Sequence, residues 1–158
     1  MKLAIAQFPK NKVGEQVIIF VYALAAVIIL MVISQLVTIE KLLPIMDGYQ
    51  LPGGSSTVKV LVFTMAISGV FALPFLLRMR LSPLFRIISA ILFNIYSLIW
   101  LVLGIWVTLN NPPLSGTGIF GSLLASIPDS AVLPLGIALT SCSMLATILL
   151  RADLKFKN

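Results

Sequence analysis

The chain has 158 residues, enough for one domain; 59% of them are apolar and only 10% are charged. An average soluble domain is about one quarter charged, so this composition excludes an ordinary soluble fold and indicates a membrane protein. The net charge of +6 does not indicate nucleic-acid binding, because the eleven Lys and Arg lie in short blocks between apolar runs. Histidine is absent and Cys142 is the only cysteine, which excludes an intrachain disulfide and a His/Cys metal site.

The first two apolar runs predict membrane-spanning helices over about 17–37 and 60–77. The first run carries no charge and covers about 30 Å as a helix, the thickness of the hydrocarbon core. A cleaved signal peptide is the alternative, but the run is too long and no small-x-small cleavage site follows it. In the second run, Pro74 leaves the carbonyl of Val70 without a donor and should kink or end the last turn. Gln35, near the end of the first run, is expected to reach the membrane interface.

The third run, about 86–107, follows Ser82 and Pro83, which are typical of an N-cap and a first helical residue. Trp106 lies near its end, where an indole favours the membrane interface. The fourth run, about 131–150, follows Asp129 and Ser130, either of which could cap it. Pro134 then falls in the first turn, where a missing N–H costs little. The four runs predict an all-α fold, an integral membrane four-helix bundle in which residues 1–158 form one transmembrane domain.

Basic residues predict the orientation of the bundle. Nine of the eleven lie in the N-terminal segment, the second loop and the C-terminal tail, two lie in the first loop, and the third loop has none. Because basic residues favour cytoplasmic segments, both termini are expected in the cytoplasm and the first and third loops on the outer face. The nine are Lys2, Lys10, Lys12, Arg78, Arg80, Arg86, Arg151, Lys155 and Lys157, and the two are Lys41 and Lys59.

The two outer loops have different patterns. The first contains Pro44, Asp47-Gly48 and the segment 51–54, all of which indicate turns. The third carries apolar residues whose spacing puts them on one face of a two-turn helix. This short helix should lie along the membrane interface or plug the mouth of the bundle. Plain burial of the loop against the bundle is the alternative. The apolar residues are Ile119, Phe120, Leu123, Leu124 and Ile127.

Uncharged polar residues recur inside the apolar runs, whereas Asp, Glu, Lys and Arg lie outside them or at their ends. The lack of an intramembrane charge is unlike a pump or a proton-coupled transporter that works alone. The polar and small residues fall on stripes, which favours close helix packing. The alternative is a polar lining for a quinone head group or a small solute. The candidate lining residues are Thr64, Ser68, Asn94, Ser97 and Thr140, and Gly136, Ser143 and Thr147 continue the stripe of the fourth run.

Motifs for independent catalysis are missing from the sequence. The chain has no phosphate-binding glycine loop, no His/Glu metal pair, no GxSxG elbow and no CxxC. No Ser or Thr has a neighbouring base that would activate it. Cys142 is expected in the middle of the fourth run, where a cysteine in apolar surroundings usually acts as a small apolar residue with little reactivity. The sequence therefore indicates a protein that is not an enzyme, with no catalytic residues and no metal site.

One stretch of the third loop, 115–124, together with the apolar run that follows it, resembles the DoxX-like and MauE-like membrane proteins. The segment 70–77 with 81–83 after it is also similar to the end of the second helix in that group. The motif residues are Thr117, Gly118, Ile119, Phe120 and Gly121. The resemblance covers about residues 60–151 and implies a four-helix bundle of the cytoplasmic membrane, associated with thiol redox or with maturation of exported redox proteins.

The chain departs from this family where the family's chemistry lies. The corresponding loop of MauE-type members often reads Cys-Gly-Cys-Phe-Gly, and Thr117 and Ile119 stand at the two cysteine positions. Neither residue can exchange disulfides, so the resemblance implies loop architecture through Gly118, Phe120 and Gly121, without the cysteine-dependent activity.

The sequence leads to three functional hypotheses. The first is a non-catalytic accessory or scaffold protein of the DoxX/MauE-like type in a bacterial cytoplasmic membrane. It would contact the lipid bilayer and a membrane or extracytoplasmic protein partner, bind no nucleic acid, assist a redox system and need no cofactor. The alternative is a bundle that binds a quinone or small solute for electron transfer or transport. A pore-forming or holin-like protein is the third.

Overall fold

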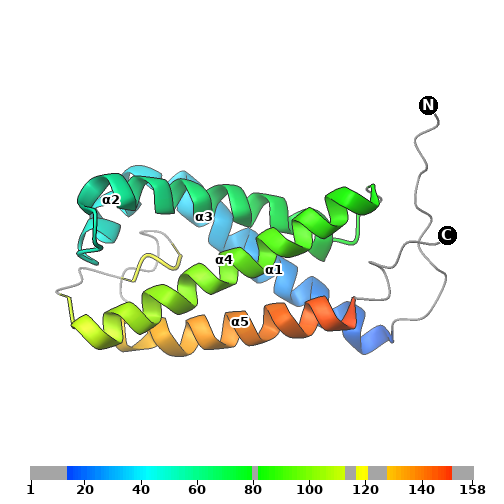
Figure 1. The fold of residues 1–158 in the computed structure, drawn as a ribbon. Coiled ribbons are helices and arrows are strands. Elements are labelled where there is room, and N and C mark those ends of the chain that lie inside the picture. The colour runs from blue at the N-terminus through cyan, green and yellow to red at the C-terminus, as the bar shows by residue number, and fades with distance from the viewer. Residues whose placement is uncertain (1–13, 80–81, 113–116, 121–127, 151–158) are drawn as a thin grey trace.

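Four long helices and two short ones make up the described part of the chain in the computed structural model, which covers residues 14–79, 82–112, 117–120 and 128–150. All regular secondary structure in these ranges is helical, and the long helices lie side by side (Figure 1). The elements are α1 (Glu15–Val37), α2 (Ile39–Asp47), α3 (Gly54–Leu76), α4 (Pro83–Asn110), the 3-10 turn η1 (Asp129–Ala131) and α5 (Val132–Leu149).

Four of the described helices, α1, α3, α4 and α5, are long and apolar enough to cross a membrane. This finding makes the chain a multi-pass membrane protein with a helical bundle, as the apolar runs predict. The largest difference from the predicted boundaries is in α3, which begins at Gly54, six residues before the predicted start at 60. The added residues are mostly polar, and a hydropathy pattern excludes such residues from a span even when the helix continues through them.

The longer helices also take in charged side chains. Lys59 lies in α3 and is exposed, whereas Arg86 lies in the first turn of α4 and is only 8% exposed. The placement of these two residues in loops is therefore wrong. The Nη2 atom of Arg86 is itself buried, so its guanidinium group lies inside the protein surface.

The segment between the first and second spans contains α2, which its turn residues do not predict. Pro44 lies inside this helix, so its reading as a turn residue is wrong. The ring occupies an exposed position, while Leu42, Ile45 and Met46 face the core and are buried. Burial of this apolar face outweighs the hydrogen bond that the proline removes, because tertiary packing supplies most of the stability of a short helix.

Pro74 lies in the last turn of α3, where a hydroxyl from the next helix forms hydrogen bonds with the backbone. The helix ends two residues later at Leu76, as a proline in the last turn predicts. Ser89 of α4 donates its hydroxyl to the carbonyl of Phe71 and accepts the N–H of Phe75 at 3.1 Å. The side chain of Ser89 thus stands in for the helical hydrogen bond between these two residues of α3.

The two predicted caps have different outcomes. Ser82 accepts the N–H of Phe85 at 3.4 Å and Pro83 is the first residue of α4, so the N-cap prediction is confirmed. The prediction that Ser130 caps the fourth span is wrong, because α5 begins after Ala131 without a side-chain cap, and the side chain of Asp129 lies outside what the structure describes. A 3-10 turn leads into this helix instead, and it tightens the backbone in place of a cap.

Glycines allow α5 to pack closely on α4. A Cβ atom on Gly104 would lie 2.7 Å from the Cα of Leu133, and one on Gly136 would lie 2.8 Å from the carbonyl oxygen of Trp100. Neither helix could approach as closely with a larger residue at these positions. Around the bundle the helices follow the order α1, α3, α4, α5, and α1 contacts α5 only sparsely. The candidate site lies where these first and last helices are sparsely packed against each other.

Candidate functional site

The described part of the third loop, 117–120, is bonded to the bundle through its backbone; we call it the anchored loop. Its carbonyl oxygens accept hydrogen bonds from side chains of the first third of the chain. Tyr49 Oη donates to the carbonyl of Thr117 at 2.6 Å, and Gln35 Nε2 donates to that of Ile119 at 2.7 Å. Ser34 donates its hydroxyl to the carbonyl of Phe120. Three donors therefore fix three of four successive peptide units.

Gln35 is the centre of this arrangement. Its amide is 3% exposed, so the expectation that it reaches the interface is wrong. Besides the bond to Ile119, its Oε1 accepts the hydroxyl of Tyr96 from α4 at 3.3 Å. An amide in a membrane-spanning helix needs such partners because no water is available to supply them. Gln35 consequently links α1, α4 and the anchored loop.

The helix α2 covers the other side of the anchored loop. Gly118 has φ +68°, and a Cβ atom there would lie 2.5 Å from Cε of Met46 and 3.0 Å from Cδ1 of Leu42. The positive backbone angle favours glycine at this position, and any larger residue would displace the end of the Met46 side chain. Trp106 donates its indole N–H to the carbonyl of Tyr49 at 2.9 Å, which ties the α2–α3 connection to α4.

The motif and the predicted helix of the third loop are described only in part. Thr117 and Ile119 are 0% and 3% exposed, and Phe120 is half-buried. Gly121, Leu123, Leu124 and Ile127 lie outside the described residues. Ile119 and Phe120 form a turn, so the apolar face predicted for a short helix does not begin with them. The described part of the loop is buried against the end of the bundle, the alternative that the sequence left open.

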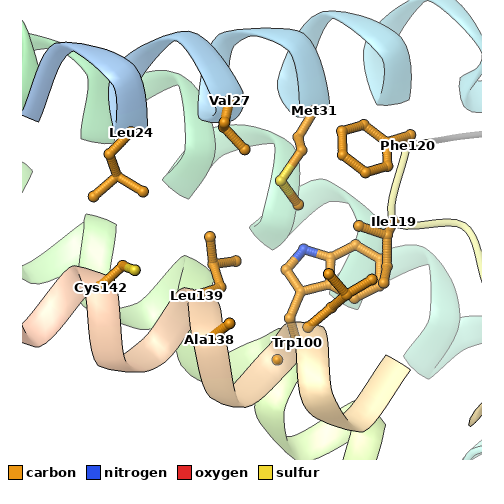
Figure 2. A pocket seen from close by; sticks show the side chains of 11 residues that line it. Leu24, Val27, Met31, Trp100, Ile119, Phe120, Ala138, Leu139 and Cys142 are labelled. Atoms are coloured by element: carbon orange, nitrogen blue, oxygen red, sulfur yellow. The ribbon is translucent and has the colours of Figure 1, made fainter. Parts of the chain in front are cut away.

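An apolar pocket of about 220 Å³ lies between α1 and α5, with the anchored loop at one end. Figure 2 shows Leu24, Val27 and Met31 pointing from α1 toward α5, with Ile119 and Phe120 closing the side next to Met31. The other lining residues are Trp100 of α4 and Leu135, Gly136, Ala138, Leu139 and Cys142 of α5.

The pocket surface consists of apolar atoms alone. The indole nitrogen of Trp100, on a side chain that is 1% exposed, is buried and makes no hydrogen bond of normal geometry within the described residues. Its polar neighbour is the hydroxyl of Tyr96, one turn earlier in α4. The carbonyls of Ile119 and Phe120 already accept hydrogen bonds. The pocket can therefore hold an apolar group, and the described residues that line it present no polar atom to a head group.

The candidate lining residues predicted from the sequence do not surround this pocket. Thr64 is exposed and donates to the carbonyl of Val60 in its own helix, and Ser68 likewise donates to the carbonyl of Thr64. Ser97 donates to Phe93, whereas Thr140 of α5 crosses to the carbonyl of Ser97 at 3.1 Å.

Asn94 instead joins α4 to α5 at a shallow hollow on the bundle surface. Its Nδ2 donates to the carbonyl of Ala90 at 2.8 Å and to the hydroxyl of Thr147 at 3.0 Å, and its Oδ1 accepts from Ser143 at 3.4 Å. The polar stripe of α5 thus contributes hydrogen bonds to the α4–α5 contact, as the packing interpretation describes.

The sequence identified the residues of the anchored loop as a motif, but not the residues that hold the loop or Trp100 in the pocket wall. Ser34, Gln35 and Tyr49 hold the anchored loop, and Trp100 forms one wall of the pocket. A weak signal was present, since Gln35 is an amide within an otherwise apolar run. Its partner Ile119 lies 84 residues away, a separation that no local pattern encodes. Among the described residues no group of three His, Cys, Asp or Glu could hold a metal ion.

Comparison of the chain with family models, curated proteins and solved structures gives no match. The resemblance to the DoxX-like and MauE-like proteins stays a prediction.

Proposed function

We propose that the chain is a non-catalytic accessory protein of the DoxX/MauE-like type that binds a protein partner at the end of the bundle carrying α2 and the anchored loop. The observation behind this proposal is the bonding of the anchored loop to Ser34, Gln35 and Tyr49. A loop held in one conformation before binding loses little freedom when a partner docks, which favours affinity. The partner is a membrane or extracytoplasmic protein of a redox system.

The proposal includes the orientation and the membrane. Both termini lie in the cytoplasm of a bacterial cell, because nine basic residues flank that side of the spans. The anchored loop then faces the extracytoplasmic space, where exported redox proteins mature. Thr117 and Ile119, which stand at the cysteine positions of the resembled family, leave this chain a binding role in place of disulfide exchange.

The test is purification of the tagged protein in mild detergent, with mass spectrometry of what remains bound. We expect a stoichiometric redox protein with the native chain and its loss with Phe120→Ala, which removes a half-buried ring from the anchored loop. Leu84→Ala is the control, since Leu84 is 67% exposed at the start of α4, at the opposite end of the bundle from α2 (Figure 1). Retention of the same partner by Phe120→Ala would show that the anchored loop is not the contact. Absence of any stoichiometric protein from the native preparation would refute the accessory function.

The quinone-binding alternative depended on a polar lining formed by Thr64, Ser68, Asn94 and Thr140. Thr64 and Ser68 bond within their own helix, and Asn94 and Thr140 bond within the α4–α5 contact. No described feature favours the pore-forming alternative. We therefore propose the accessory function and neither of these alternatives.

A further inference from the structure

We propose that the pocket between α1 and α5 binds one acyl chain of a bilayer phospholipid, which enters sideways from the membrane. The anchored loop closes one end of this pocket, but the inference does not require the protein partner, because its test uses only the protein and lipid vesicles. The inference follows from three features of the pocket: its apolar lining, its long axis along the helices, and its opening toward the membrane.

The composition of the pocket admits hydrocarbon and excludes a head group. Its surface consists of apolar atoms, and the peptide carbonyls at its closed end are already bonded to Ser34 and Gln35. A charged or strongly hydrated group would lose its hydration here without replacement, which costs several kcal/mol in general. A methylene chain that moves from the bilayer into the pocket loses no hydration, and it makes dispersion contacts with the walls.

The direction of the pocket matches that of a lipid chain. On α1 the lining runs from Leu24 to Met31 and on α5 from Leu135 to Cys142, about 10 Å along each helix at 1.5 Å per residue. The pocket is therefore elongated along the helix axes, parallel to the acyl chains of a bilayer around the bundle. The anchored loop closes one end, so that a chain enters between the helices and not from above.

The mouth of the pocket is continuous with the lipid-facing surface. Val27 and Leu135, one from each helix, line the pocket and are also 42% and 38% exposed, so the pocket is open to the surroundings of the bundle at these residues. Among the described residues α1 contacts α5 only sparsely, so these two helices do not close the side of the pocket by packing against each other. An unfilled space beside liquid hydrocarbon would leave its walls without contacts, and the nearest molecules that can fill it are the membrane lipids.

Trp100 provides the readout, since it forms a wall of the pocket and is itself almost completely buried. The protein carrying Trp106→Phe has Trp100 as its only tryptophan, and it is reconstituted into phosphatidylcholine vesicles with or without bromine on the acyl chains. Bromine quenches tryptophan at short range. We expect loss of Trp100 fluorescence in the brominated vesicles.

Two filling variants and a matched control make the result specific. Ala138→Leu and Cys142→Leu enlarge side chains in the pocket wall at different positions and should restore the fluorescence. Ala26→Leu adds the same group on the exposed side of α1, outside the pocket lining, and should leave the quenching unchanged. Quenching from lipid outside the pocket would be equal in all variants. Equal fluorescence in both kinds of vesicle, or quenching that neither filling variant reduces, would overturn the proposal.

Discussion

The side-chain amide of Gln35 donates a hydrogen bond of 2.7 Å to the backbone carbonyl of Ile119. This one contact joins the first membrane-spanning helix to a loop that lies beyond the third, and the hydroxyl of Tyr96 completes it on the other side of the amide. All three groups are buried, so each depends on the others for its hydrogen bonds.

Replacing Gln35 with leucine should destabilise the protein. The change leaves the carbonyl of Ile119 and the hydroxyl of Tyr96 without this partner, and a buried polar group left unpaired costs about 1–3 kcal/mol. Titration with sodium dodecyl sulfate in mixed micelles, followed by circular dichroism, measures the free energy of unfolding. Gln16→Leu is the matched control, because Gln16 is exposed on the same helix. Equal stability of the two variants would contradict the role given to Gln35.

Ser89→Ala should also lower the free energy of unfolding. The hydroxyl bridges Phe71 and Phe75 in the last turns of α3, next to Pro74, which already lacks an N–H. Its removal is expected to cost about 1–2 kcal/mol, within the range for a buried unpaired group, because the two backbone groups can partly pair with each other. The same titration serves, with the exposed Ser141→Ala of α5 as control. A stability equal to that of the control would mean that the N–H of Phe75 and the carbonyl of Phe71 pair with each other fully once the hydroxyl is removed.

Gly104→Val tests the close contact of α4 with α5. The new Cβ atom would lie 2.7 Å from the Cα of Leu133, a backbone atom that cannot move without moving the helix. Overpacking of this kind costs typically about 1–3 kcal/mol. Gly14→Val is the control, since no atom lies within 4 Å of the Cβ position there. If both variants unfold at the same detergent concentration, the two helices are not held at the distance described.

The orientation can be tested with single cysteines in a Cys142→Ser background. Ser55→Cys places a thiol at an exposed position at the start of α3, and Met79→Cys places one just beyond its end. In intact cells we expect a membrane-impermeant maleimide to label the first and not the second, because the basic residues predict that α3 ends in the cytoplasm. The second thiol should react only after the membrane is opened. The reverse pattern would invert the orientation.

The sequence predicts the long helices well and the site poorly. The starts of α1 and α5 lie within two residues of their predicted positions, because the apolar composition of a segment is enough to predict where a membrane-spanning helix begins. The helix α2 was not predicted, because Pro44 indicates a turn locally and only the packing of Leu42 and Met46 on the bundle outweighs it. The anchored loop depends on pairs such as Gln35 and Ile119, which meet only after the helices have assembled.

That separation along the chain also sets an order of events during synthesis. Gln35 and Ile119 are 84 residues apart, so at 5–20 residues per second the carbonyl is made about 4–17 s after the amide. Tyr96, the partner of the amide oxygen, lies 61 residues from Gln35 and is made earlier, so the acceptor for the amide nitrogen is the last part of the arrangement to be made. A nascent chain that stops short of the loop would therefore leave this buried arrangement incomplete.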